Sequence, residues 1–416
     1  MSDNYSLIIK NGSCYINGKL IKDFNSKNSN SKPFLVCSGG TSSRCAANGY
    51  WTLDLRKNYR EIIYDNSNQT VEVGAGVNMS SLIQELSRKG KTFPIGLSGQ
   101  TGIGYILTGG ISPISRSKGL AIDQIINIKG YWGNGDKIDI SKPNSNSSIR
   151  DIEKWRGLCG AAPFLAIITS IKLNIYTPKP LYIYQAIINP DQLAESIYKV
   201  ESWPNSASFQ WVWGERIKAF VVIEESDIKT NSHQELINEL PFKNEATLSI
   251  INGLHELPRF DIPLKSKRSI KNYHSEVLSL LGKEWGKDTT SLIKSISKLI
   301  KSKPNQHCYV ASQQMGGACS SIDRNESSFI HRNAAWKPWI NSAWEKGNSN
   351  EREQSFLWLE EVWQTMEKYC PGVHLAQLHP HLPWHQKELK SAFLDWLPGL
   401  QTLKSRYDPQ GLLPPL

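Results

Sequence analysis

The sequence predicts an α+β fold with antiparallel strands, divided into two or three domains. The chain has 416 residues, and domains contain roughly 150 residues each. Residues 1–178 alternate short β-like runs with Gly-rich turns, whereas residues 181–375 mix strand-like runs with amphipathic helices. Hydrophobic residues make up 39% and charged residues 21% of the chain. This ordinary globular balance excludes wholesale disorder.

A strand followed by a helix is the clearest local pattern in the first stretch. Residues 70–73 alternate like a strand, and residues 81–86 carry the apolar stripe of a helix. Ser81 and Gln84 have the spacing of a capping box, and Gly90 stands where a helix-ending glycine is expected. The pattern therefore predicts a helix that begins at Ser81 and ends before Gly90.

The remaining elements follow from turn signals and hydrophobic periodicity. Asn-Gly within residues 133–136 lies between two β-like runs and predicts a hairpin. Residues 164–176 have the pattern of a long strand, and residues 177–180 contain two prolines and predict a linker. The second stretch is expected to contain strands over 182–188, 208–213 and 219–223, and helices over 191–201, 289–301, 351–368 and 384–404.

The positive charge of the chain is concentrated in its first part. The net charge is +10, and residues 1–180 carry 22 Lys and Arg against 12 Asp and Glu, whereas residues 181–416 carry 26 of each kind. A basic domain suits either a nucleic acid or a small anionic ligand. Because no zinc finger, RNA-recognition signature or basic zipper accompanies the charge, we expect no nucleic-acid partner.

Cysteine usage and hydropathy indicate the compartment. No apolar run approaches the ~20 residues of a membrane-spanning helix, and residues 1–12 lack the pattern of a secretory signal. An odd number of scattered cysteines favours a reducing compartment, so we expect a cytoplasmic protein. The seven cysteines are Cys14, Cys37, Cys45, Cys159, Cys308, Cys319 and Cys370.

A double-glycine loop follows the first strand. Residues 34–37 are apolar and run into residues 38–43, Ser-Gly-Gly-Thr-Ser-Ser. Two consecutive glycines let successive N–H groups converge on an anion, and the hydroxyls add donors. Two interpretations stay open for this segment taken alone, an ordinary polar turn and an anion nest. The absence of a following Gly-Lys-Ser/Thr excludes a Walker A loop.

Two further glycine-rich segments differ in what they indicate. Residues 74–79 imitate a dinucleotide fingerprint, but Met79 replaces the third glycine and no acidic residue stands at the ribose position. We therefore interpret that segment as a tight strand-to-helix turn. Residues 93–110 carry repeated glycines among Ile, Leu and Tyr. This density suits a backbone that passes close to a flat ligand or to another strand.

Five segments in order resemble one known family. Residues 36–43, 54–57, 71–76, 93–110 and 115–123 resemble the FAD-binding domain of the vanillyl-alcohol-oxidase/PCMH superfamily. Trp155-Arg156-Gly157 with residues 164–169 resembles the strand that closes that domain. Tyr407-Asp408-Pro409 and Ile330-His331-Arg332 resemble segments of its berberine-bridge-enzyme-like branch.

The resemblance implies a fold and a set of cofactor contacts. It implies a two-subdomain PCMH-type FAD-binding domain over residues 1–178 and a substrate domain over 179–395, whose antiparallel sheet is flanked by helices. Residues 396–416 would return to the FAD-binding domain. The backbone of the loop at 38–42 would hold the pyrophosphate, and that of Ile167 would meet the cofactor. The residues implied in the cofactor site are Ser38, Gly39, Gly40, Thr41, Ser42, Ser98, Thr101, Gly102, Ile103, Gly104 and Ile167.

Departures from the family pattern predict how the cofactor is held. Thr41 and Ser98 stand where relatives carry the His and the Cys that attach FAD covalently, and Cys37 replaces an Arg. We therefore expect non-covalent FAD. The Tyr and Asn segments that flank the flavin in the branch are not evident at residues 374–377 and 393–396, so the base of the family is missing.

Several residues are candidates for the reacting side. His374 is the candidate base, because an unperturbed imidazole pKa of ~6.5 suits neutral pH. His379, His381 and His385 have irregular spacing without a completing Cys or carboxylate, so no metal is expected.

Aromatic and sulfur side chains admit two interpretations each. Phe209, Trp211 and Trp213 share a strand face and serve either as sheet core, the favoured interpretation, or as a roof over a flat ligand. Cys37 and Cys45 flank the double-glycine loop. They are interpreted as two buried small residues rather than a redox pair.

The function implied is an FAD-dependent oxidoreductase, an oxidase or dehydrogenase, that takes a hydride from an alcohol or sugar-like substrate. Its partners would be that small molecule and an electron acceptor, oxygen or another. The alternative is a catalytically degenerate relative of the same fold that binds flavin or a small ligand.

Overall fold

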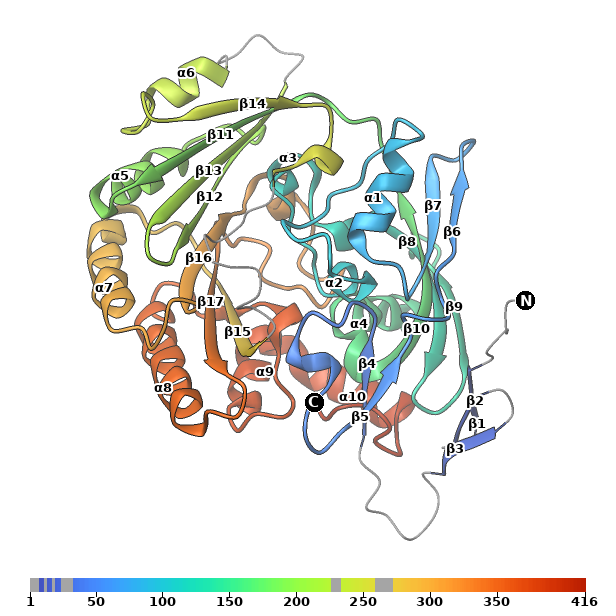
Figure 1. Cartoon of the computed structure of the whole chain (residues 1–416). Coiled ribbons are helices and arrows are strands. Elements are labelled where there is room, and N and C mark those ends of the chain that lie inside the picture. Colours follow the sequence, from blue (N-terminus) through green and yellow to red (C-terminus); the bar gives the residue numbers. More distant parts are fainter. Residues whose placement is uncertain (1–6, 11–12, 17–18, 24–32, 226–232, 259–271) are drawn as a thin grey trace.

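The computed structural model describes residues 7–10, 13–16, 19–23, 33–225, 233–258 and 272–416. Figure 1 shows two halves side by side, one built on a five-stranded sheet and the other on an eight-stranded sheet. Part of the segment used above to argue against a secretory signal, residues 1–6 and 11–12, lies outside the described residues. Helices lie on both sheets, so the predicted α+β class is confirmed.

The first half is organised around an antiparallel sheet. Its strand order is β6-β7-β10-β8-β9. A three-stranded sheet, β1-β2-β3, and a parallel pair, β4-β5, accompany it. The strands are β1 (Leu7–Lys10), β2 (Ser13–Ile16), β3 (Lys19–Asp23), β4 (Phe34–Cys37), β5 (Trp51–Asp54), β6 (Ile62–Asp65), β7 (Thr70–Gly74), β8 (Ile125–Trp132), β9 (Lys137–Ser141) and β10 (Ala166–Asn174). The predicted hairpin is confirmed, because β8 and β9 pair antiparallel around Gly133–Asp136.

Two sequence predictions in this half are corrected. Helix α1 (Met79–Ser87) begins two residues earlier than expected, because the Asn78 side chain accepts from the Ser81 N–H at 2.8 Å and is the N-cap. The strand expected from residue 164 begins at Ala166, because Phe164 and Leu165 end helix α4 (Ile149–Leu165). The other helices here are α2 (Ile103–Leu107) and α3 (Ser115–Lys118).

The second half is an antiparallel sheet of order β14-β11-β13-β12-β16-β17-β15-β18. Its strands are β11 (Leu181–Ile188), β12 (Ala207–Trp213), β13 (Ile217–Glu224), β14 (Thr247–Ile251), β15 (Tyr273–Leu281), β16 (Tyr309–Gln314), β17 (Trp336–Glu345) and β18 (Gly372–Val373). Its helices are α5 (Pro190–Val200), α6 (His233–Asn238), α7 (Thr289–Lys301) and α8 (Ser349–Met366). Helices α5, α7 and α8 pack on one face of the sheet (Figure 1), and its other face meets the first half.

The end of the chain packs against the first half. Helices α9 (His385–Phe393) and α10 (Leu397–Tyr407) follow the second sheet, and α10 packs on α4. The Phe34 N–H donates to Leu412 O at 2.8 Å, which ties the C-terminal segment to β4. The division of the chain into domains at residues 178 and 395 stays a prediction.

Buried arginines join the two halves. Arg116 of α3 donates to three carbonyls of the second half, those of Trp203, Ala207 and Met315, at 2.6–2.8 Å. Arg332 pairs with Asp123 at 2.7 Å, and both side chains are buried. Two family-like segments that are 200 residues apart therefore meet at this boundary. Among the described residues no helix is long and apolar enough to cross a membrane.

Candidate active site

The double-glycine loop and the glycine-rich segment 96–110 lie directly against each other. A Cβ atom added at Gly102 would lie 2.5 Å from the carbonyl carbon of Ser38, and one at Gly39 would overlap the Gly102 nitrogen. The Gly104 N–H also donates to Ser38 Oγ at 3.1 Å. Because only glycine permits this approach, the two segments form one continuous wall.

That wall borders a cavity of about 270 Å³. Nine residues implied in the cofactor site line it, namely Ser38, Gly39, Gly40, Thr41, Ser42, Ser98, Thr101, Gly102 and Gly104. Two do not: Ile103 is a core residue at the start of α2, and Ile167 is fully buried in β10. The Ile167 carbonyl faces Gly130 of the neighbouring strand.

The loop presents donors that fit an anion. Within the described part of the chain, the N–H groups of Gly39 and Thr41 make no hydrogen bond. The half-buried Arg44 side chain also lines the cavity, donates to Leu375 O and has its guanidinium carbon 5.6 Å from the centre of the Phe164 ring. Free backbone donors beside hydroxyls and a cation match the chemistry of a pyrophosphate.

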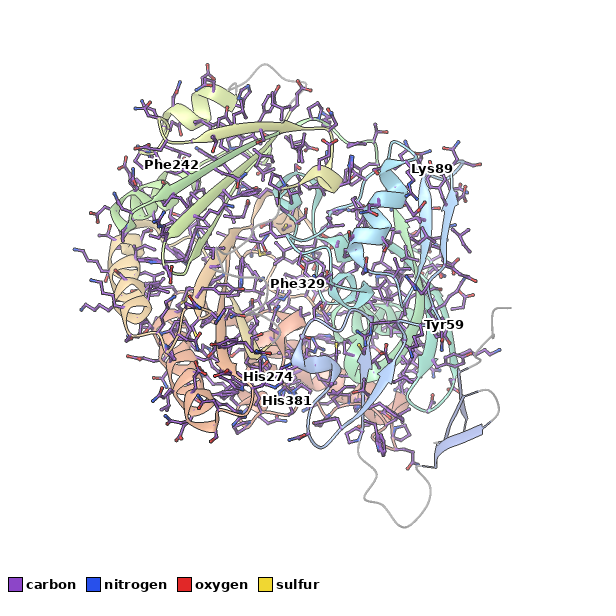
Figure 2. The ribbon with its side chains drawn as sticks, in the orientation of Figure 1. Tyr59, Lys89, Phe242, His274, Phe329 and His381 are labelled. Carbon is purple, nitrogen blue, oxygen red and sulfur yellow. The ribbon has the colours of Figure 1, made fainter. Side chains whose placement is uncertain are left out.

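The opposite wall comes from the second half and carries a buried ionic chain. Glu276 of β15 accepts from Ser43 Oγ at 2.6 Å and lies 3.2 Å from His379 Nε2. His379 Nδ1 lies 2.6 Å from Glu388 of α9. His381 lies 3.5 Å from Glu276 and is labelled in Figure 2. The chain of contacts ties the cofactor-side loop to two elements of the second half.

The charges of Glu276, His379 and Glu388 stabilise one another. Although burial opposes a charged imidazole, Glu388 and Glu276 raise the pKa of His379 to about 10. Burial also opposes ionisation of Glu276, but hydrogen bonds with His379 and His381 hold its pKa well below the usual range. An imidazolium therefore lies between two carboxylates at neutral pH.

His374 lies behind the inner end of the cavity. Its Nδ1 is 3.0 Å from Oε1 of Gln377, a cavity-lining residue, and its buried Nε2 has no partner among the described residues. Phe329, which Figure 2 shows between the two halves, packs edge-on against it. Burial and the nearby Lys337 charge lower the pKa of His374 well below its usual value. The expectation of an unperturbed imidazole was wrong, because burial and the Lys337 charge both oppose protonation of His374.

Three adjacent strands place a row of polar side chains beside His374. Gln210 of β12 is opposite Gln313 of β16, which is opposite Lys337 of β17. Gln210 Oε1 and Gln313 Nε2 are buried without partners among the described residues. Gln210 also bonds to Ser208, whose hydroxyl donates to Pro113 O of the first half. The row therefore faces the first half.

Lys337 is the cation of this row. Its ammonium lies 4.4 Å from the centre of the Trp339 ring, and burial lowers its pKa to about 7. Buried polar groups normally find partners, so unpartnered amides around a lysine mark a place built for a ligand or water. The arrangement can bind a hydroxylated molecule and accept a proton from it.

Residues 21–141 match a family described as an FAD binding domain. Three solved structures share the fold. Physcomitrella patens BBE-like 1 has a TM-score of 0.75 and 18% identity, over 92% of this chain and 84% of that one. Chitooligosaccharide oxidase has a TM-score of 0.75 and 14% identity, over 91% of this chain and 85% of that one, and berberine bridge enzyme from Eschscholzia californica has a TM-score of 0.73 and 18% identity, over 93% of this chain and 86% of that one. The chain has a berberine-bridge-enzyme-like fold, and its residues 21–141 are similar to an FAD binding domain.

Curated relatives of this chain carry related names. The FAD-linked oxidoreductase azaL of Aspergillus niger is 29% identical over 154 residues, 36% of this chain and 31% of that protein. The uncharacterized FAD-linked oxidoreductase YgaK of Bacillus subtilis is 20% identical over 386 residues, which cover 86% of this chain and 80% of that protein. The matches to the first such relatives span only 23–37% of their length. These names describe the same type of activity as the prediction, which stays a proposal for this chain.

Sequence reasoning missed the charged residues that the second half places at or near the cavity. Glu276, Glu388 and Lys337 carried no recognised motif, although a lysine between Trp336 and Pro338 in an apolar strand was a usable signal. The aromatic residues of β12 are core, since Trp211 and Phe209 are fully buried and Phe209 stacks with Phe242. No group of three or more His, Cys, Asp or Glu side chains in the described residues could hold a metal ion.

Proposed function

We propose that this protein holds FAD non-covalently and takes a hydride from an alcohol or sugar-like donor. One observation carries the proposal: a cavity has a glycine-rich, donor-presenting wall from the first half, and its other side is lined by β15 of the sheet in which the buried amides of Gln210 and Gln313 lack partners among the described residues. Thr41 and Ser98 both line the cavity. Because neutral hydroxyls do not replace the attaching His and Cys, the flavin would be free to dissociate.

The first wall would bind the pyrophosphate of FAD. The N–H groups of Gly39 and Thr41, the Ser42 hydroxyl and the Arg44 guanidinium would meet its charge. Glu276, which contacts His379, would hold this loop in position by accepting the hydrogen bond from Ser43.

The second wall would bind and deprotonate the donor. FAD, when bound, supplies the hydride acceptor. Lys337, neutral above pH about 7, would accept the donor hydroxyl proton, while Gln210 and Gln313 would orient that hydroxyl. His374 would remain neutral beside them. The electron acceptor would be oxygen or another oxidant, and the scattered cysteines favour action in the cytoplasm.

Flavin release and flavin bleaching test the proposal. Acid precipitation of the purified yellow protein should leave all flavin in the supernatant, and flavin in the pellet would contradict non-covalent binding. Under anaerobic conditions, a panel of alcohols and sugars should include one that bleaches the 450-nm band. A protein that binds FAD stoichiometrically but is bleached by no donor would support the catalytically degenerate alternative.

A further inference from the structure

Lys404 of α10 is a buried cation whose ammonium contacts four oxygens. These oxygens lie 2.5–3.0 Å from Nζ and belong to the Asp408 carboxylate and to the carbonyls of Phe164, Leu413 and Pro414. The Lys404 side chain is only 14% exposed. An ammonium carries three donors and no acceptor, and a buried charge is tolerated only where such partners meet it. The four oxygens therefore fix the position of the ammonium, and the ammonium fixes theirs.

Asp408 holds the same segment from its N–H side. Its Oδ1 accepts from the Leu412 N–H at 2.7 Å, and its Oδ2 accepts from the Leu413 N–H at 2.9 Å. The carboxylate is fully buried and lies against Gly133, where an added Cβ would overlap it. Residues 412–414 are therefore held through their N–H groups by Asp408 and through their carbonyls by Lys404. We call this arrangement the Lys404–Asp408 clamp.

The segment held by the clamp is part of the cavity. Pro414 lines the cavity, and the Leu412 carbonyl accepts from the Phe34 N–H at the start of β4. Figure 1 shows α10 close to β4, the strand that leads into the double-glycine loop. The clamp therefore bears both on a residue that lines the cavity and on the strand that precedes the anion-binding loop.

The ammonium of Lys404 also reaches a second lining residue, Phe164. The Phe164 carbonyl accepts from Lys404 at 2.8 Å, and Phe164 lines the cavity together with Arg44. The Arg44 guanidinium lies over the Phe164 ring, an arrangement in which the face of the ring attracts the cation. Through Phe164 the clamp therefore influences where the cation of the anion-binding wall lies.

We propose that Lys404 and Asp408 are positioning residues for the cofactor, which hold residues 412–414 and Phe164 as part of the cavity wall against which FAD binds. Neither Lys404 nor Asp408 lines the cavity, so both act through the backbone that they hold. The effect on FAD rests on the proposed function, whereas the effect on residues 412–414 does not.

Titration of FAD into flavin-free protein tests the proposal. Lys404→Met removes the ammonium and with it the hydrogen bonds to the carbonyls of Leu413 and Pro414. The freed segment must be ordered again when FAD binds, and ordering a single residue corresponds to about a ten-fold rise in Kd. We expect a rise of at least that size. Asp408→Asn keeps one acceptor oxygen and should give a smaller rise.

Asn305→Ala is the matched control for these variants. The Asn305 amide also joins distant segments, because it donates to Ala343 O and to Glu351, but all three residues lie in the second half and none lines the cavity. Lys404→Met and Asn305→Ala should both lower the unfolding temperature of the flavin-free protein. Only Lys404→Met should raise the Kd for FAD at a temperature where both variants are folded. A Kd equal to that of the wild type, or an equal rise in the control, would overturn the proposal.

Hydrogen exchange of the wild type provides a test that needs no variant. FAD should slow exchange in peptides covering residues 408–416 more than in peptides covering α7, which packs on the sheet face away from the first half. Equal slowing would overturn the proposal. A wild type that binds no FAD would instead overturn the proposed function. In that case, faster exchange at Leu412 and Leu413 in Asp408→Asn than in Asn305→Ala would still support the clamp, and unchanged exchange would overturn it.

Discussion

The two walls of the cavity are built in opposite ways. The glycine-rich wall consists of backbone from segments within residues 38–104, and its chemistry is that of N–H groups and hydroxyls. The other wall is made of residues 275–277 of β15 and of residues 376–380, and it includes Glu276 and His379 of the ionic cluster. A backbone wall depends on glycine at particular positions, whereas a side-chain wall depends on strand register. Substitutions should therefore disable the two walls through different measurable properties.

Lys337→Met should have the largest effect on turnover and little on cofactor binding. Loss of the proton acceptor should lower kcat by roughly 10²-fold or more, because general-base catalysis contributes about that much. The wild-type kcat should rise with pH through about 7, where Lys337 loses its proton, and this limb should vanish in the variant. Steady-state kinetics with the identified donor and flavin content measure both.

Lys303→Met is the matched control for that substitution. Burial lowers the pKa of Lys303 too, but its ammonium donates to Cys308 O away from the cavity. The control should keep the pH limb. A Lys337 variant with normal turnover and an unchanged pH profile would show that Lys337 is not the base.

His379→Gln should destabilise the fold and loosen the cofactor loop. Breaking a buried ion pair costs about 3–5 kcal/mol. Since the folded pKa of about 10 exceeds the usual 6.5, the stabilisation by His379 is complete below pH 6.5 and disappears as pH rises towards 10. Glu276, whose pKa is lowered from 4.5, contributes stability that is complete above pH 4.5 and is lost progressively as the pH falls further.

Thermal unfolding across pH measures this contribution. The difference between wild type and His379→Gln should be greatest between pH 4.5 and 6.5 and should shrink towards pH 10. His255→Gln, at the partly exposed His255 in a 3₁₀ turn, should change stability by less than about 0.5 kcal/mol. An equal loss at all pH values would show that packing, and not charge, explains the role of His379.

Gly39→Ala should act on the backbone wall alone. The added methyl group overlaps the Gly102 nitrogen, so the two segments must separate. We expect FAD content, from the ratio of absorbance at 450 and 280 nm, to fall by about ten-fold. Gly104→Ala, whose methyl would lie 3.1 Å from the Ser38 hydroxyl, should lose much less flavin. Equal losses would mean that contact between Gly39 and Gly102 does not shape the site.

Sequence reasoning recovered the backbone wall because its signal is local. A glycine doublet followed by hydroxyl residues indicates a turn that can bind an anion. Nine of the eleven residues implied in the cofactor site line the cavity. The first residue of α1 was harder to predict. Asn78 and Ser81 are both residue types that favour the N-cap position, and the structure shows that Asn78 is the N-cap. His374 was found as a residue, but its lowered pKa follows from neighbours distant in sequence.

The amino-acid sequence by itself determined the α+β class, several strands and helices of each half and the glycine contacts, because these depend on periodicity and on conformations that few residues adopt. Only the tertiary structure decided which charges meet. Strand register aligns Gln210, Gln313 and Lys337, and the packing of α9 brings Glu388 to His379. Electrostatic interactions act over a few ångströms in space, and that distance is set by the folded chain rather than by separation along it.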